Sequence, residues 1–356
     1  MGLVALASSA TAQPGQQGRF FRLSPEMFDV TPPSARVRGV PGGMVAQPRA
    51  CPAMATNETR RRIVNVAEQE WGFFGFPIVD QTNVETRLLP PGIVADAVNP
   101  RLEAPRVEPR YPRLGAYEDA ERVLTTIGGY WAATPEVNAI LTAQNNAWNG
   151  PGGDDVTWQQ PWSAAFISWV MCEGGLGNKT QFDRSIAHRI YIDQAIRARD
   201  GNAAQAAYVA YDPGEMPMSP GDLLCNGRRQ NYRTIADRRR NLGEGARSHC
   251  DIVVKIDEAS KHIFVIGGNV HRSVSMTLLP GVREPGEQFR PVDETMLDGV
   301  RTVFAHLKHR GPAIEANALD NSPTIKTLEC AMALPPRAGS NAGPRRPAKC
   351  GPAPEE

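Results

Sequence analysis

A change in hydrophobic period after Gly201 constrains the fold of this chain more than any other feature. Upstream of Gly201, hydrophobic residues recur every three or four positions, as they do along one face of a helix. Downstream, they alternate with polar residues in short runs, which is typical of strands. Because the helices precede the strands instead of alternating with them, we predict an α+β domain in which N-terminal helices are followed by an antiparallel sheet.

The predicted helices have recognisable ends. Thr56 or Asn57 can cap the first helix, which ends in the motif WGFFGFP. Another helix begins with Thr134 as its cap and Pro135 at the first helical position, where proline costs least. The remaining predicted helices cover residues 118–132, residues 162–173 and the segment between Ser185 and Gly201.

Short strands are predicted in the second half of the chain. Their motifs are GDLLCN, HCDIVVKI, KHIFVIGGN and SVSMTLL, and the polar turn DEASK separates the second from the third. A hairpin of residues 249–256 and 262–269 would bring His249 and Asn269 to the same end of the sheet.

The two ends of the chain differ in composition from the middle. Residues 1–12 are small and apolar and end in Ala-Thr-Ala, which fits a signal-peptide remnant and predicts a periplasmic or secreted protein. Residues 13–56 are dense in Pro, Gly and Arg, and we expect an extended or disordered spacer. Residues 311–356 are expected to form a Pro-rich tail. One domain, residues 57–310, lies between them.

Charge and apolar run length argue against two classes of partner. With 39 basic and 38 acidic residues, the net charge of +1 provides no field that would gather nucleic acid. No apolar run in the domain approaches the ~20 residues of a transmembrane segment. No coiled-coil or repeat period indicates an oligomeric state.

The six cysteines form an even set without CxxC metal spacing, and we expect neither a metal nor another cofactor. Cys225 and Cys250 could join neighbouring strands, while Cys330 and Cys350 could close a loop in the tail. Six free thiols are also compatible with the sequence.

The motif PWSAAFISW places Ser163 at the start of a helix, where unpaired amides and the helix dipole favour developing negative charge. Pro161 supports this placement, because proline is tolerated in the first turn. Ser163 is therefore a candidate nucleophile, although serine is also a common helix cap. Gln160 is a candidate donor to an oxyanion, and Trp162 either lines a cleft or packs in the core.

A serine nucleophile needs a base that takes its proton, and the base needs an orienting acceptor. His249 is the candidate base and Asn269 the candidate orienter. Asp251 lies on the same strand face as His249 and is the second candidate, either for an acid or for the orienter. His188 is interpreted more readily as a structural histidine than as a catalytic one.

The order of Ser163, His249 and Asn269 in an α+β layout resembles the papain-like cell-wall hydrolases of the NlpC and CHAP type, whose catalytic helix carries WCAxF. Here Ser163 stands in place of the cysteine. The resemblance implies a papain-like domain that hydrolyses an amide bond, with peptidoglycan peptide as the expected substrate. A closer resemblance, to the bacterial domain-of-unknown-function family 2272, covers about residues 57–280. Its motifs are VAEQEWGFFG, GGYW, PWSAAFISWVM, SIAHRIYI, GDLLC, SHCDIVV and IGGNV.

Two other functions remain open at this point. The chain could be a cell-wall-binding protein that has lost turnover, or a serine esterase or acyltransferase on the same fold. The segment Gly227–Arg247 contains seven arginines. We interpret it either as a cationic lid over an anionic substrate or as a solvated loop.

Overall fold

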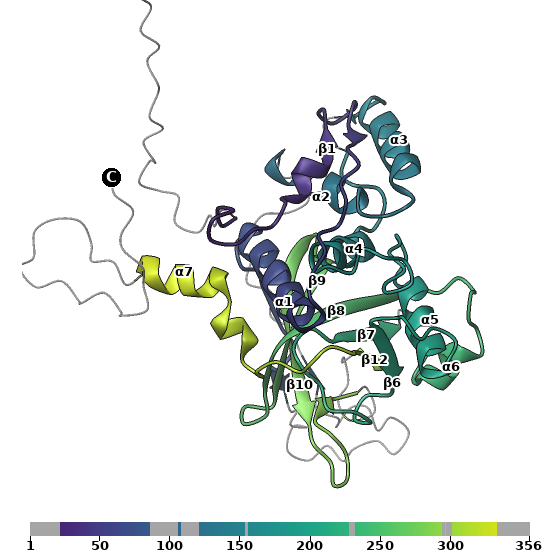
Figure 1. The fold of residues 1–356 in the computed structure, drawn as a ribbon, viewed down its shortest axis with the longest axis vertical. Helices are drawn as coiled ribbons and strands as arrows, with labels where there is room; N and C mark the ends of the chain where they lie inside the picture. The colour runs from purple at the N-terminus through teal and green to yellow at the C-terminus, as the bar shows by residue number, and fades with distance from the viewer. Residues whose placement is uncertain are drawn as a thin grey trace, which may run out of the picture.

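The computed structural model describes residues 22–85, 106–107, 121–153, 156–227, 232–293, 296 and 301–332. Over these residues the chain is a mixed α+β structure, with most helices in the first half and most of the sheet in the second (Figure 1). This arrangement confirms the fold class predicted from the change in hydrophobic period.

Every helix predicted from the sequence is present, but Ala55 caps the first in place of Thr56 or Asn57, and Glu136 caps the third in place of Thr134. The described helices are α1 (Thr56–Phe73), α2 (Glu121–Trp131), α3 (Val137–Trp148), α4 (Ser163–Glu173), α5 (His188–Arg199), α6 (Ile235–Arg239) and α7 (Pro323–Met332). Helix α5 does not start directly after Ser185, because the Ser185 hydroxyl accepts a hydrogen bond from the nearby Ala187 amide in a turn. His188 consequently becomes the first residue of α5.

The main sheet has the strand order β11-β10-β9-β8-β7-β12-β6, and β3 also pairs with β10, through residues 276–278. Its strands are β3 (Ile78–Asp80), β6 (Tyr208–Tyr211), β7 (Leu223–Gly227), β8 (Ser248–Asp257), β9 (His262–Val270), β10 (Ser273–Val282), β11 (Arg290–Pro291) and β12 (Val303–His309). The pairs are antiparallel except β3 with β10, which is parallel. The predicted hairpin is confirmed as β8 and β9.

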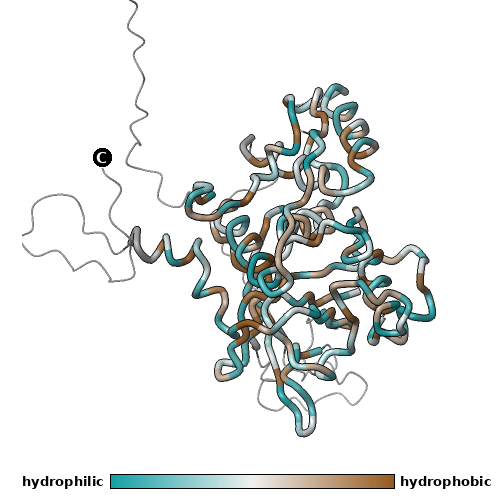
Figure 2. The backbone as a smooth tube through the Cα atoms, in the orientation of Figure 1, coloured by the Kyte–Doolittle hydropathy of each residue, from teal (hydrophilic) through white to brown (hydrophobic). Residues whose placement is uncertain are grey.

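Helix α4 is the buried centre of the domain. Every residue from Ser163 to Glu173 is buried, because hydrophobic side chains occupy all sides of this helix. It packs against α1 and α2 and against β8 and β9, and Figure 1 shows it between α2 and the strands. In Figure 2, hydrophilic and hydrophobic stretches alternate along the outer helices and loops, as expected for elements with one buried side.

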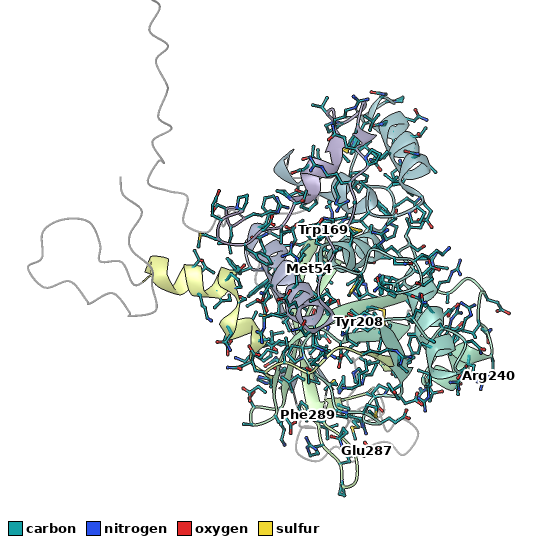
Figure 3. The ribbon with its side chains drawn as sticks, in the orientation of Figure 1. Met54, Trp169, Tyr208, Arg240, Glu287 and Phe289 are labelled. Carbon is teal, nitrogen blue, oxygen red and sulfur yellow. A yellow bond between two sulfur atoms is a disulfide. The ribbon has the colours of Figure 1, made fainter. Side chains whose placement is uncertain are left out.

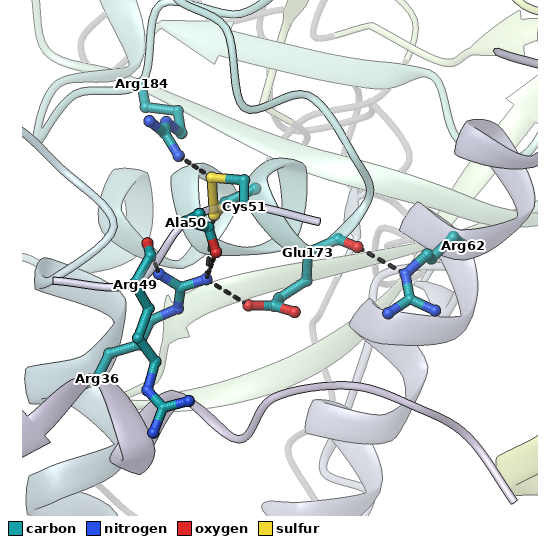
Figure 4. Close-up of a disulfide and its surroundings, with 8 residues drawn as sticks. Arg36, Arg49, Ala50, Cys51, Arg62, Glu173 and Arg184 are labelled. Carbon is teal, nitrogen blue, oxygen red and sulfur yellow. Dashed lines mark hydrogen bonds and ion pairs between the residues drawn. A yellow bond between two sulfur atoms is a disulfide. The ribbon is translucent and has the colours of Figure 1, made fainter. Parts of the chain in front are cut away.

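Residues 22–56 lack long periodic elements, as predicted, but they are not a spacer. They contain a short 3₁₀ helix (Pro33–Arg36) and the ribbon β1 (Val37–Arg38) and β2 (Val45–Ala46). Arg36 forms a buried ion pair with Glu173 at the end of α4, with 2.6 Å between Nη2 and Oε1 (Figure 4). A disulfide between Cys51 and Cys172 joins the segment to the same helix. This segment is therefore ordered by tertiary contacts, which cannot be predicted from its amino-acid composition.

A second disulfide joins Cys225 and Cys250 across the neighbouring strands β7 and β8, in agreement with one of the sequence alternatives. The bond between Cys51 and Cys172 was not predicted, because the two residues are 121 positions apart and Cys51 was assigned to a spacer. Cys330 and Cys350 lie outside the described side chains.

The first part of the predicted Pro-rich tail is ordered. A 3₁₀ helix (Ala318–Asn321) and α7 pack against α1, and Arg61 of α1 is paired with Glu315. The remainder of that tail and the predicted signal-peptide remnant, residues 1–12, lie outside the described residues. Among the described helices, none combines the length and the apolarity that crossing a membrane requires.

A further short ribbon pairs β4 (Val84–Glu85) with β5 (Arg106–Val107).

Candidate functional site

A cleft of about 390 Å³ opens beside the start of α4. Its walls include the exposed Gln160 before α4, the buried Ser163 at the start of α4 and His188 at the start of α5. Arg247 and Ser248, at the start of β8, also line the cleft. These three segments are distant in sequence. They meet because α4 and α5 both pack against β8.

Ser163 is the first residue of α4 and is 5% exposed. The first hydrogen bond of the helix runs from Phe166 N to Trp162 O, so the Ser163 amide precedes the helical ladder and belongs to the positive end of α4. Trp162 is fully buried and stacks on Phe74 and Tyr130, with ring centroids 6.0 Å and 5.8 Å apart. Trp162 therefore packs in the core, and Ser163 is presented to the cleft from a rigid support.

His188 is the histidine that contacts Ser163. Its Nε2 lies 2.7 Å from Ser163 Oγ. Its Nδ1 accepts a hydrogen bond from the backbone N–H of Cys250 on β8, at 3.2 Å, and contacts the hydroxyl of Tyr191. The sequence favoured a structural role for His188, but the structure brings it, and not His249, into hydrogen-bond contact with the candidate nucleophile.

His249 lies beside this pair and is bonded to the second candidate orienter. Its Nε2 is 2.8 Å from Asp251 Oδ1. Both residues are buried and lie near the start of β8. The rings of His249 and His188 have centroids 5.1 Å apart. Asn269 stands at the end of β9, as predicted, with a left-handed φ of 55°, but the acceptor on the His249 ring is Asp251. Nδ1 of His249 has no hydrogen-bond partner among the described residues.

Two glycines of the IGGN motif allow this arrangement. A Cβ on Gly267 would lie 1.8 Å from Asp251 Oδ1 and 3.1 Å from His249 Nε2. A Cβ on Gly268 would lie 2.4 Å from Cβ of Phe166 in α4. Only glycine at these positions lets the His249–Asp251 pair and helix α4 approach β9 so closely.

Tyr191 is the site residue that sequence reasoning missed. It follows His188 by three positions in the motif HRIYI, a spacing that places both side chains on one face of α5. Burial, and then the negative charge of Asp251, raise the pKa of Tyr191 well above its usual value. Its hydroxyl therefore keeps its proton at neutral pH.

The Arg-rich segment is anchored to α5. Arg238, buried in α6, makes two hydrogen bonds of 2.7 Å to the carboxylate of Asp193 in α5. Arg239 is paired with Asp200, and Arg240, which Figure 3 shows at the outer edge of the molecule, is paired with Asp237. Arg247 lines the cleft. The described part of the segment is thus a docked element with most of its charge paired, and a single one of its described arginines reaches the cleft.

The arrangement has the components of acyl-transfer chemistry: a hydroxyl at a helix start, an imidazole in contact with it, and a second imidazole held by a carboxylate. Within the described ranges, no three His, Cys, Asp or Glu side chains are grouped so that they could hold a metal ion.

Comparison with known proteins identifies the family. A family model described as "Uncharacterized protein conserved in bacteria (DUF2272)" matches residues 118–308, which is more than half of the chain and contains both histidines of the site. No curated protein and no solved structure matches the chain. The chain therefore belongs to the DUF2272 family of uncharacterized bacterial proteins.

Proposed function

We propose that this protein is an exported hydrolase that attacks an amide carbonyl with Ser163, and that its substrate is the peptide of peptidoglycan. The observation that carries the proposal is the 2.7 Å contact between Ser163 Oγ and His188 Nε2 in the wall of the cleft, at the positive end of α4. Ser163 does not cap α4, since Trp162 is the cap residue and no side chain makes a capping hydrogen bond there.

The neighbouring residues supply the remaining chemical roles. We assign the role of base to His249 Nδ1, which has no hydrogen bond to Ser163 Oγ in the free protein and has to approach it when substrate binds, and Asp251 holds the Nε2–H of His249 and so fixes the ring. The backbone amide of Ser163 and the side chain of Gln160 donate to the developing oxyanion. This assignment keeps Ser163 as nucleophile and His249 as base, and gives the orienting role to Asp251 in place of Asn269.

The choice of substrate rests on the layout. A buried helix that starts with the nucleophile and packs on a strand that starts with the histidine is the arrangement expected of a papain-like cell-wall hydrolase. Export, to the periplasm or beyond, is supported by two disulfides among the described residues, since disulfides persist in oxidising compartments.

A fluorophosphonate probe, which reacts covalently with activated serines, tests the proposal. We expect labelling of the wild-type protein that maps to Ser163 and is lost in Ser163→Ala. Ser248→Ala is the matched control, because Ser248 also lines the cleft but contacts no imidazole, and it should retain the label. Incubation with purified peptidoglycan, followed by mass spectrometry of the released peptides, then identifies the bond that is cut.

Absence of label in the wild-type protein, together with binding of peptidoglycan that Ser163→Ala does not weaken, would replace the proposal with that of a wall-binding protein without turnover. Labelling at Ser163 with turnover of esters alone would indicate an esterase or acyltransferase.

A further inference from the structure

The contacts of His188 determine which of its nitrogens carries the proton. A backbone N–H can donate a hydrogen bond but cannot accept one. Because the Cys250 amide donates to Nδ1 at 3.2 Å, Nδ1 must present a lone pair. The neutral His188 ring therefore has its proton on Nε2.

Tyr191 reinforces this tautomer. Its hydroxyl contacts the same Nδ1, and the buried phenol remains protonated, so it acts as a second donor. A proton on Nδ1, as in the other tautomer or in an imidazolium, would face the Cys250 N–H and lose that hydrogen bond. All the groups concerned are buried, which makes such a loss costly.

This protonation state of His188 determines what its Nε2 can do to Ser163. A nitrogen that already carries a proton cannot remove one from the hydroxyl 2.7 Å away, and it donates to Ser163 Oγ instead. His249 has the complementary state: its Nε2–H donates to Asp251, and its Nδ1 offers a lone pair that no described residue uses.

We propose that His188 acts on Ser163 as a fixed hydrogen-bond donor and not as its base. The inference rests on the proposed function. As the substrate binds, His249 Nδ1, which has no hydrogen bond to Ser163 in the free protein, comes within reach of Oγ. As Oγ forms a bond to the carbonyl carbon, the C=O π electrons move onto the carbonyl oxygen and the Ser163 proton passes to His249 Nδ1, while the Nε2 proton stays on His188 and stabilises the negative charge that develops on Oγ. The C=O bond then re-forms, the C–N bond breaks, and His249 gives its proton to the leaving amine nitrogen. In the hydrolysis of the acyl-enzyme, a water molecule loses a proton to His249 as its oxygen bonds to the carbonyl carbon, the C–Oγ bond breaks with its electron pair returning to Oγ, and His249 passes the proton to Oγ.

The tautomer is tested directly by ¹⁵N NMR of the histidine rings in the folded protein at neutral pH, with His188 assigned by its loss in His188→Gln. We expect a pyridine-like shift for Nδ1 and a pyrrole-like shift for Nε2. Tyr191→Phe should leave this pattern unchanged, because the Cys250 amide still donates. A pyrrole-like Nδ1 in the wild-type protein would overturn the inference, whether or not the protein is an enzyme.

The role of His188 is tested by the rate of fluorophosphonate labelling at Ser163. Glutamine can donate through its amide N–H but cannot serve as a base, whereas leucine can do neither. We expect His188→Gln to remain within about tenfold of the wild-type rate and His188→Leu to lose about 100-fold, the typical effect of removing one preorganised donor. Unfolding transitions of both variants show that each is folded.

Equal loss in His188→Gln and His188→Leu would mean that His188 is the base and would overturn the inference while leaving the serine hydrolase intact. Absence of label in the wild-type protein would instead refute the proposed function, and the NMR tautomer would still decide the state of His188.

Discussion

The close approach of β9 to the His249–Asp251 pair makes Gly267→Ala a sharp test of the site. The added methyl group would begin 1.8 Å from Asp251 Oδ1, whereas ordinary contact starts at 3.4 Å. Strand β9 cannot retreat, because β8 and β10 hold it on both sides. The carboxylate must therefore move by roughly 1.6 Å, which breaks its 2.8 Å hydrogen bond to His249.

The expected cost follows from two terms. A hydrogen bond to a charged group contributes about 1.5–3 kcal/mol, and forcing a methyl into a packed site costs about 1–3 kcal/mol. The reduced freedom of alanine in the unfolded chain returns about 0.4–1 kcal/mol. We expect the free energy of unfolding of Gly267→Ala to fall by about 3 kcal/mol, and labelling of Ser163 to slow because the ring of His249 is no longer held.

Urea denaturation at neutral pH measures the loss as a lower midpoint with an unchanged slope. Gly245→Ala is the matched control, because a Cβ at Gly245 meets nothing within 4 Å, and it should stay within about 0.5 kcal/mol of the wild type. Since the clash is with Asp251, the double variant Asp251→Ala/Gly267→Ala should be no less stable than Asp251→Ala alone. Equal stability of Gly267→Ala and Gly245→Ala would refute the described packing of the pair.

Three further predictions concern other parts of the molecule. Cys51→Ser should lower the free energy of unfolding by about 4 kcal/mol, because it opens a disulfide-closed loop of 121 residues; calorimetry of wild type and variant without reductant measures this. Arg238→Met should destabilise α6 by about 3 kcal/mol, because it leaves Asp193 buried without its partner; hydrogen exchange in residues 232–247 reports it, with the exposed Arg233→Met as control. Burial, and then the charge of Arg60, lower the pKa of His309 to about 4, so the unfolded chain binds a proton first as pH falls. Stability should therefore drop by up to about 3 kcal/mol between pH 6.5 and pH 4, and urea titrations should show a shallower drop in His309→Gln.

The sequence predicts the elements of this fold well, because helix and strand patterns are set by neighbouring residues. Thr56 and the motif WGFFGFP mark the ends of α1, and the alternation in HCDIVVKI and KHIFVIGGN gives β8 and β9 with the hairpin between them. The same alternation places Asp251 on the face of His249. The disulfide between Cys225 and Cys250 also follows from the pairing of their strands.

Predictions from amino-acid composition were wrong for segments that are ordered by contacts with distant parts of the chain. The Pro- and Gly-rich residues before α1 have no period of their own, yet Arg36 and Cys51 bind them to the end of α4. Likewise, the arginines of the segment before β8 look like free charge in the sequence, but Asp193 in α5 and Asp200 directly after α5 neutralise two of them.

The sequence alone determined the α+β class, the position of Ser163 at a helix start and the candidate histidines, because each depends on residues a few positions apart. Tertiary structure decided which imidazole touches Ser163. That contact depends on how α5 docks against β8, where the Cys250 amide and Tyr191 meet the His188 ring. Docking is the summed packing of side chains from the whole chain, and no local pattern encodes it.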